Sequence, residues 1–448
     1  MLVSETPPPV DAVSSGRLRI LVVTHGAWRE DTSIGNSYSN IFSGMGDKFE
    51  FAQIYLKGSS PNSELVSRFF HIPEKALIKS CITRRPVGSE GVKSSDDASL
   101  TSYGSTYDWF RRHRLELFLL GRDLTEALGK WKSNELYDFV ESFNPDIIFG
   151  TLIYMPVINK LMLHLSERYS IPLVTYAWDD FYTTKRRSLS PFYWARFAAE
   201  RPLIRRCATK SSRVYVINEP MREEYESCFG KSCRILVKGN RFDEGHKPDL
   251  KTQGDVLELL YVGNIGDGRW QVLADLAKTV KWSNGSGVGK RLHLTVHTLS
   301  AIDGRMREAL TVPGACSIMP PITASEVPDR LKSADVLIHV EPTSEKGRLQ
   351  NRLSFSTKLV DYLFARRCIL ALGGPTASID YLERNDAALV EHDPAYFTAL
   401  VSKIASDSSI VDEYADKAWK CGERNHQIED IQNNLYESFR ALCGERQC

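Results

Sequence analysis

Residues 257–270, Leu-Glu-Leu-Leu-Tyr-Val-Gly-Asn-Ile-Gly-Asp-Gly-Arg-Trp, join a short apolar run to a glycine-rich loop. The run from Leu257 to Val262 is typical of a buried parallel strand. In open parallel sheets, ligands bind beyond the C-terminal ends of the strands. Glycines there let the backbone approach a ligand closely, and the planar guanidinium of Arg269 suits a diphosphate. A turn with a surface arginine has the same spacing, so this loop alone leaves both interpretations open.

A second polar segment, residues 355–374, follows in the same half of the chain. Ser356 or Thr357 is a natural N-cap, which predicts free amides at the start of a helix. Lys358 and Asp361 are three residues apart and share one helix face. One cation could therefore face phosphates while one carboxylate accepts hydrogen bonds from ribose hydroxyls. An ordinary intrahelical ion pair explains the same spacing, and composition alone favours it.

Strands and helices alternate through both halves of the chain, which predicts two doubly wound parallel-sheet α/β domains. A chain of 448 residues also exceeds what one hydrophobic core normally serves. We expect a disordered leader (1–16), a Rossmann-like N-terminal domain (17–241), a Rossmann-like C-terminal domain (242–425) and a C-terminal helix (426–448) that could cross back to the first domain. The predicted strands are 19–24, 49–56, 146–150, 172–178, 213–217 and 234–237, then 257–262, 292–296, 316–319, 336–340, 369–372 and 388–390.

Residues 57–106 interrupt this alternation. Their later part, 88–99, has too little apolar surface to pack, so we expect a mobile loop there. From residue 107 to 143 the apolar spacing becomes helical again. The side chains expected to face inward are Trp109, Leu117, Leu120, Leu124, Leu128 and Trp131.

The composition excludes several classes of protein. Lys and Arg total 57 against 56 Asp and Glu, so the whole chain has no field that would attract nucleic acid. The nine cysteines lack the paired CxxC spacing of a zinc site, and so long a chain needs no disulfides. We therefore expect reduced thiols in a cytoplasm. No apolar run approaches the roughly 20 residues that span a bilayer.

The two polar segments, in their order as well as their residues, resemble the donor site of family 4 glycosyltransferases, which have the GT-B fold. In that family a strand-Gly-loop carries a basic pair for the diphosphate. A later P/S-x-K-x-x-E-Y-L-A-x-G-x-P-V-L-A segment, which residues 357–371 follow closely from its second position, carries the ribose acid. The resemblance implies two domains facing each other across a cleft, retention of anomeric configuration, and no metal or cofactor. The donor-binding residues that it implies are Gly263, Asn264, Gly266, Arg269, Ile322, Ser356, Thr357, Lys358 and Asp361.

Two positions depart from the family's pattern. Asn264 stands where the first basic residue of the phosphate clamp is usual, so the clamp has one formal charge fewer. Leu353 stands where the family often has an acid, eight residues before Asp361, that holds the donor sugar. The long polar segment 341–352 could substitute for that acid.

Two loops of the N-terminal domain lie at the matching sheet edge. Residues 24–36 resemble the acceptor-side loop that approaches the donor phosphates, with candidate residues His25, Gly26, Gly35 and Asn36. Residues 176–182 carry Asp179 and Asp180 between aromatic residues, and either carboxylate could bind sugar hydroxyls or act as a base. We expect the catalytic residues to be Asp179, Asp180 and Arg269. A polar surface loop and a capped turn are the alternatives.

A basic stretch with interleaved aromatics, residues 182–213, could lie on an anionic membrane surface, or form a partly buried helix with a solvated basic face. The sequence thus predicts a cytoplasmic enzyme, peripheral at the inner face of the membrane. It would move a sugar from a nucleotide-diphosphate sugar to a saccharide or lipid-linked acceptor in surface polysaccharide or glycoconjugate synthesis. The alternatives are a nucleotide-sugar epimerase on the same fold and a non-catalytic nucleotide- or sugar-binding protein.

Overall fold

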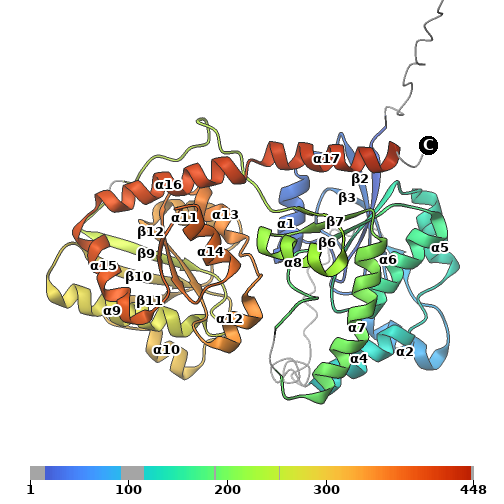
Figure 1. Ribbon diagram of the computed structural model, residues 1–448, viewed down its shortest axis with the longest axis horizontal. Helices are drawn as coiled ribbons and strands as arrows, with labels where there is room; N and C mark the ends of the chain where they lie inside the picture. The colour runs from blue at the N-terminus through green and yellow to red at the C-terminus, as the bar shows by residue number, and fades with distance from the viewer. Residues whose placement is uncertain (1–15, 92–115, 186–187, 252, 445–448) are drawn as a thin grey trace, which may run out of the picture.

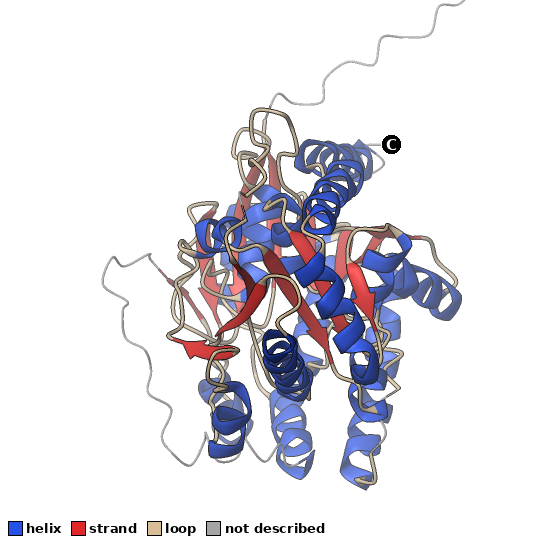
Figure 2. Cartoon of the chain, turned by 90° about the vertical axis from the view of Figure 1, so that its left-hand side faces the viewer, coloured by secondary structure: helices blue, strands red, loops and turns tan. Residues whose placement is uncertain are grey.

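The computed structural model describes residues 16–91, 116–185, 188–251 and 253–444, which form two α/β domains side by side (Figure 1). Each domain is a sheet of mainly parallel strands with helices on its two faces, so the predicted fold class is confirmed. Figure 2, in which the C-terminal domain faces the viewer, shows strands enclosed by helices. The predicted leader falls outside the described residues up to residue 15, and the expected mobile loop does so from residue 92.

The described part of the N-terminal domain has an eight-stranded sheet of order β4-β3-β2-β1-β5-β6-β7-β8, in which β4 is antiparallel to β3. The strands are β1 (Leu18–Val23), β2 (Phe49–Tyr55), β3 (Val66–His71), β4 (Ser89–Gly91), β5 (Ile147–Thr151), β6 (Leu173–Ala177), β7 (Arg213–Val216) and β8 (Cys233–Ile235). Successive side chains of a strand point to opposite faces. Ile20 and Val22 therefore enter one core, and Leu21 and Val23 enter the other. Because both faces are covered, the buried part of this strand, Ile20 to Val23, is entirely apolar.

Helices cover the two faces of this sheet unequally. One face packs against α1 and the C-terminal helix α17, and the other packs against α5 to α8. The helices that the structure describes in this domain are α1 (Ser33–Phe42), α2 (Glu74–Thr83), α4 (Glu116–Leu128), α5 (Asn134–Phe143), α6 (Pro156–Tyr169), α7 (Pro191–Lys210) and α8 (Glu219–Phe229).

Two expectations for this domain were wrong. Residues 66–91 are not an interruption, because β3, α2 and β4 extend the sheet and its helical layer, and residues 89–91 are held by pairing with β3. In α4, Leu124 and Leu128 are exposed, at 58% and 60%. The helix instead turns Asp123 and Glu126 inward, where Arg196 of α7 pairs with Asp123. Trp131 is buried as expected. Trp109 lies outside the described residues, as does the side chain of Leu117.

The C-terminal domain has, within the described residues, a six-stranded parallel sheet of order β11-β10-β9-β12-β13-β14. Its strands are β9 (Val256–Val262), β10 (Arg291–His297), β11 (Cys316–Met319), β12 (Val336–Glu341), β13 (Cys368–Gly373) and β14 (Leu389–Glu391). Its helices are α9 (Arg269–Ser286), α10 (Gly304–Leu310), α11 (Val327–Ser333), α12 (Glu345–Asn351), α13 (Lys358–Phe364), α14 (Ala377–Arg384), the 3₁₀ turn η1 (Pro394–Tyr396), α15 (Phe397–Ser406) and α16 (Ser409–Asn425).

Within the described residues, the chain crosses between the domains twice, at neighbouring places. Helix α16 lies on the C-terminal domain and α17 (Ile428–Gly444) continues from it across the N-terminal domain (Figure 1). Phe439 of α17 is fully buried against Phe49 and Phe149. The earlier crossing pairs with the later one, since the Asn240 amide donates to the His426 carbonyl at 2.9 Å. Among the described residues, no helix has the length and apolar character needed to cross a bilayer.

Candidate functional site

A pocket of about 410 Å³ lies between the two domains, and both contribute to its walls. We call it the interdomain pocket. The N-terminal domain lines it with the loop and first turns of α1 and with the segment after β8: Glu30, Asp31, Thr32, Ser33, Asn36, Lys238 and Asn240. The C-terminal domain lines it with α11, α13 and adjacent loops: Ala324, Val327, Pro328, Leu331, Lys332, Thr357, Lys358, Asp361, Phe364 and Ala365. Four sequence-predicted residues, Asn36, Thr357, Lys358 and Asp361, therefore share one cavity.

The carboxylate of Asp361 is paired across the domain boundary. Lys238 Nζ lies 2.7 Å from each carboxylate oxygen, and the Lys238 side chain is only 9% exposed, against 33% for Asp361. Lys238 follows β8, and its carbonyl lies beside His426 where the two crossings meet. Sequence reasoning missed this lysine, because 123 residues separate the partners and no local spacing links them.

The amine of Lys358 lies under the glycine-rich loop. Its Nζ is 4.4 Å from the ring centroid of Tyr261, within range of a cation–π interaction. A Cβ atom at Gly263 would come within 3.0 Å of the same nitrogen, so glycine at this position leaves room for the amine. Burial lowers the pKa of Lys358 to about 8, and the charge of Arg269 contributes to that shift. Two cations are thus held close together.

Arg269, the first residue of α9, is already paired with an acid in the structure. Its guanidinium donates to Glu341 Oε2 at 2.9 Å, at the end of β12. Burial opposes ionisation of Glu341, but His339, Arg269 and Lys358 outweigh it and keep the pKa of that carboxyl below its ordinary value. A guanidinium has five N–H donors, so this ion pair leaves others free for an anionic ligand.

Asn264 shapes the glycine-rich loop by hydrogen bonds within it. Its Oδ1 accepts hydrogen bonds from the Gly266 amide at 2.7 Å and the Ser300 hydroxyl at 2.9 Å. Gly268 precedes α9 with a φ of +95°, a conformation that favours glycine. The side chain of Asn264 therefore orders the turn, and Lys358 supplies the second positive charge beside Arg269.

The start of α13 lies where the sequence predicts it. Thr357 is the N-cap residue, but its side chain makes no capping hydrogen bond, because its backbone is already helical and the hydroxyl cannot reach the following amides. The backbone amide of Ser356 donates a hydrogen bond to Ser378 Oγ at 2.9 Å, which fixes Ser356 in place. Ile322 is half-buried and is not among the residues that line the interdomain pocket, although Ala324 of the same loop is.

The predicted acceptor-side loop divides into two parts. His25 Nε2 lies 2.7 Å from Glu74 Oε1 of α2, and Gly26 forms a β-bridge with Lys57, so both face the neighbouring strand connection. Gly35 packs so closely against the Arg29 carbonyl that a Cβ atom would clash with it. Asn36, in the first turns of α1, lines the interdomain pocket.

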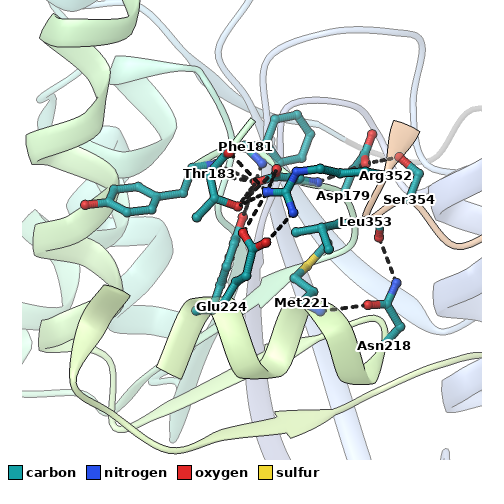
Figure 3. A network of polar contacts seen from close by, with 12 residues as sticks. Asp179, Phe181, Thr183, Asn218, Met221, Glu224, Arg352, Leu353 and Ser354 are labelled. Carbon is teal, nitrogen blue, oxygen red and sulfur yellow. Dashed lines mark hydrogen bonds and ion pairs between the residues drawn. The ribbon is translucent and has the colours of Figure 1, made fainter. Parts of the chain in front are cut away.

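The two aspartates after β6 have different environments (Figure 3). Asp180 Oδ1 accepts from the amides of Tyr182 and Thr183, at 3.1 and 2.8 Å, so it caps the turn. Asp179 Oδ1 accepts from the Asp180 amide at 2.9 Å and from Ser354 Oγ of the C-terminal domain at 2.7 Å. Burial raises the pKa of both carboxyls above the ordinary value, against the effect of these hydrogen bonds. The expected catalytic pair therefore consists of one turn cap and one residue at the domain contact.

The segment before α13 docks on the N-terminal domain (Figure 3). Arg352 pairs with Glu224 of α8, donates to Thr183 Oγ1 at 2.9 Å and lies 3.4 Å from Asp180 Oδ2. The side-chain amide of Asn218 donates to the Leu353 carbonyl at 2.7 Å, and the Leu353 side chain is buried. These contacts form a second junction between the domains, in addition to the one where the two chain crossings meet. It lies just before α13, the helix that lines the interdomain pocket.

Several cations of the basic stretch 182–213 have partners within the domain. Arg196 pairs with the buried Asp123, Arg206 with Glu167, and Arg201 lies over the ring of Tyr182. Arg186 and Arg187 lie outside the described residues. The surface-exposed apolar residues at the start of α7 are Leu189, Phe192 and Trp194.

The arrangement of two parallel-sheet domains with a C-terminal helix that returns to the first domain is the GT-B architecture, and solved structures share it. Sucrose-phosphate synthase from Thermosynechococcus elongatus aligns over 96% of this chain and 100% of its own, with a TM-score of 0.61 and 10% identity. The UDP-forming α,α-trehalose-phosphate synthase from Burkholderia vietnamiensis aligns over 94% and 100%, with a TM-score of 0.54 and 10% identity.

An Anabaena protein crystallised in complex with UDP-glucose aligns over 95% of this chain and 100% of its own, with a TM-score of 0.56 and 9% identity. At such low identity these similarities establish the GT-B fold and nothing finer. A scan against protein-family models and a search of curated proteins found no match.

Proposed function

We propose that this protein is a glycosyltransferase that moves a sugar from a nucleotide-diphosphate sugar to an acceptor hydroxyl. The observation that carries the proposal is the interdomain pocket, which Asp361 and Lys358 line together with apolar residues. A carboxylate suits ribose hydroxyls, and a cation suits phosphates. One similar structure is named as UDP-forming and another as a UDP-glucose complex, which makes UDP-sugars the first donors to test.

In the proposed complex the nucleoside occupies the interdomain pocket. The base packs on the apolar side chains of Val327 and Leu331 from α11, and the ribose hydroxyls donate to Asp361, which Lys238 holds in place. The diphosphate then extends from the pocket toward Lys358 and Arg269, past the backbone of Gly263 and Gly266. Ser356 and Thr357 stand beside it at the start of α13, and Ile322 stands near the base.

The proposed reaction needs negative charge on the leaving diphosphate to be stabilised as the sugar departs. Lys358 and Arg269 supply two fixed positive charges at that position, so the proposed mechanism uses no divalent ion. The acceptor hydroxyl approaches from the loops of the N-terminal domain, where His25 and Asn36 lie, and attacks on the face of the leaving group with retention of configuration. Closure of the domains brings the two sides together.

A thermal-shift panel of UDP-, GDP-, ADP- and dTDP-sugars tests the donor site, because a ligand selective for the folded protein raises its melting temperature. We expect one nucleotide to stabilise the wild-type protein and Asp361→Ala to abolish most of that shift. Asp275→Ala is the matched control, since Asp275 pairs with Lys278 on the surface of α9, outside the pocket. Equal shifts in wild-type protein and Asp361→Ala would contradict the assignment.

Product analysis with the selected donor separates the proposed activity from its alternatives. A transferase releases the nucleoside diphosphate faster when acceptor is added and yields a glycosylated acceptor. An epimerase converts the donor without any acceptor, and a non-catalytic protein binds the donor without turnover. Epimerisation of the donor without acceptor would contradict the proposed activity and favour the epimerase. Binding with no turnover across an acceptor panel would favour the non-catalytic protein.

We also propose that the acceptor is a saccharide or lipid-linked glycan of surface polysaccharide or glycoconjugate synthesis, met by a cytoplasmic protein at the inner face of a membrane. The start of α7 exposes Leu189, Phe192 and Trp194, with the exposed Lys185 nearby in sequence. Apolar side chains beside a cation favour an anionic lipid surface. Flotation with vesicles containing phosphatidylglycerol should retain wild-type protein and lose the double variant Phe192→Ser/Trp194→Ser. Equal flotation of both would contradict this proposal.

A further inference from the structure

Position 353 brings no acid to the proposed sugar site. The Leu353 side chain is buried, and its carbonyl is held by Asn218 of the other domain. Its neighbours Arg352 and Ser354 both reach the N-terminal domain, toward Asp180 and Asp179. The segment therefore contributes a docking contact, and any carboxylate that receives the sugar must come from elsewhere.

Asp179 and Asp180 are adjacent, but they differ in whether a carboxylate oxygen remains free to accept a hydrogen bond from a ligand. Both oxygens of Asp180 are engaged, by the turn amides, by Thr183 Oγ1 and by Arg352, and its side chain is only 5% exposed. Asp179 accepts both of its hydrogen bonds through Oδ1. Among the described residues, none donates to Asp179 Oδ2, and this atom is not closed off from solvent. One carboxylate oxygen is therefore left free at the domain contact.

Asp179 also lies near the proposed diphosphate site, since its hydrogen-bond partner Ser354 is four residues before Lys358. Lys358 lines the interdomain pocket, and Arg269 is close enough to Lys358 to lower its pKa. Arg269 is in turn close enough to Asp179 to act on the pKa of that carboxyl, although burial is the larger effect and raises it. A nucleotide sugar has the order nucleoside, diphosphate, sugar. With the nucleoside in the pocket and the diphosphate at Lys358 and Arg269, the sugar reaches the neighbourhood of Asp179.

We propose that Asp179 of the N-terminal domain holds a hydroxyl of the transferred sugar through Oδ2, in place of the acid that Leu353 lacks. Ser354 is a positioning residue, because its hydroxyl occupies Oδ1 and turns the other oxygen outward. The inference rests on the proposed function and deepens it. The N-terminal domain then supplies the carboxylate that binds the sugar, and the C-terminal domain supplies the cations that bind the diphosphate. The donor site is therefore complete only when the two domains are docked through Ser354 and Arg352.

Calorimetric titration with a nucleoside diphosphate and with the matching nucleotide sugar tests this assignment. The probes are UDP with UDP-glucose and GDP with GDP-mannose. Asp179→Asn should bind the free diphosphate like wild-type protein, but lose about 10- to 100-fold in affinity for the sugar ester, the usual range for a hydrogen bond to a charged group. Ser354→Ala should reduce the ratio of sugar-ester affinity to free-diphosphate affinity by a smaller factor. Asp138→Asn, an exposed aspartate of α5 in the same domain, is the matched control and should change neither affinity.

The outcomes separate this inference from the proposed function. If Asp179→Asn keeps the wild-type ratio between sugar ester and free diphosphate, the sugar is held elsewhere and the inference fails while the donor site stands. If both ligands weaken equally in Asp179→Asn and Ser354→Ala, the two residues serve only domain docking. If wild-type protein binds none of the four probes, both the proposed function and the proposed sugar subsite are contradicted.

Discussion

Lys358→Met should make the protein more stable and less able to bind a nucleotide. The ordinary lysine pKa of 10.5 falls to about 8 in the structure, and a shift of this size corresponds to about 3 kcal/mol by which the folded state disfavours the charged amine at neutral pH. Methionine has a similar length and no charge, and Glu341 keeps Arg269 and His339 as partners. The strain of a buried cation is therefore removed while the local packing is kept.

The sign of this effect can be followed with pH. The unfolded chain binds the lysine proton up to about pH 10.5 and the folded chain only up to about pH 8, so the wild-type protein gains stability through that window. The advantage of Lys358→Met in urea unfolding should be largest below pH 8 and shrink as the pH rises toward 10.5. Subtracting the free energy of unfolding of one protein from that of the other at each pH removes the contribution of the titratable groups that both contain.

Nucleotide binding should show the opposite preference. A diphosphate at Lys358 favours the charged amine, so wild-type affinity should fall as the pH rises above about 8, and calorimetry in buffers of different ionisation enthalpy should detect proton uptake on binding. Lys358→Met should bind about 10- to 100-fold more weakly at pH 7, from the loss of one charge-assisted contact, with little dependence on pH. A variant that is destabilised, or that binds nucleotide as well as wild type, would refute this reasoning.

Three further predictions concern the domain contacts and the chemistry. Arg352→Met leaves the carboxylates of Glu224 and Asp180 without their cation and should lower the free energy of unfolding by about 1–3 kcal/mol, whereas Arg206→Met, which breaks an exposed pair with Glu167, should leave urea unfolding unchanged. Phe439→Ala removes a fully buried ring between α17 and the N-terminal sheet and should cost about 3–5 kcal/mol; a loss below 1 kcal/mol in the same assay would mean that α17 is not anchored by this ring. EDTA should leave donor turnover unchanged, because Lys358 and Arg269 occupy the place of a metal; activity lost on chelation and restored by Mn²⁺ would contradict that mechanism.

The fold was predictable because its signals are local. The apolar runs at 19–24 and 257–262 contain enough β-branched and aliphatic residues to indicate buried parallel strands, and β1 and β9 form there. Residues 66–91 and α4 were harder to interpret. The α2 and β4 segments become regular through packing and pairing with distant elements, and α4 buries Asp123 and Glu126 while exposing Leu124. A pattern of polarity cannot predict an inward-facing charge whose partner, Arg196, is on another helix.

The site was predictable only where its residues are neighbours in the chain. Lys358 and Asp361 share a helix face, and both line the interdomain pocket. Lys238 and Glu341 have no such local signal, because their contacts with Asp361 and Arg269 depend on how the strands and domains assemble. Thr357 is the N-cap as predicted, but its side chain makes no capping hydrogen bond, since its own backbone is already helical.

The most direct test of the central proposal is a crystal structure of the protein with the nucleotide sugar that the thermal-shift panel selects. We predict the ribose hydroxyls within about 3 Å of the Asp361 carboxylate, the base against α11, and the diphosphate between Lys358 and Arg269. A nucleotide bound outside the interdomain pocket, or an Asp361 carboxylate that contacts only Lys238 in the complex, would contradict it.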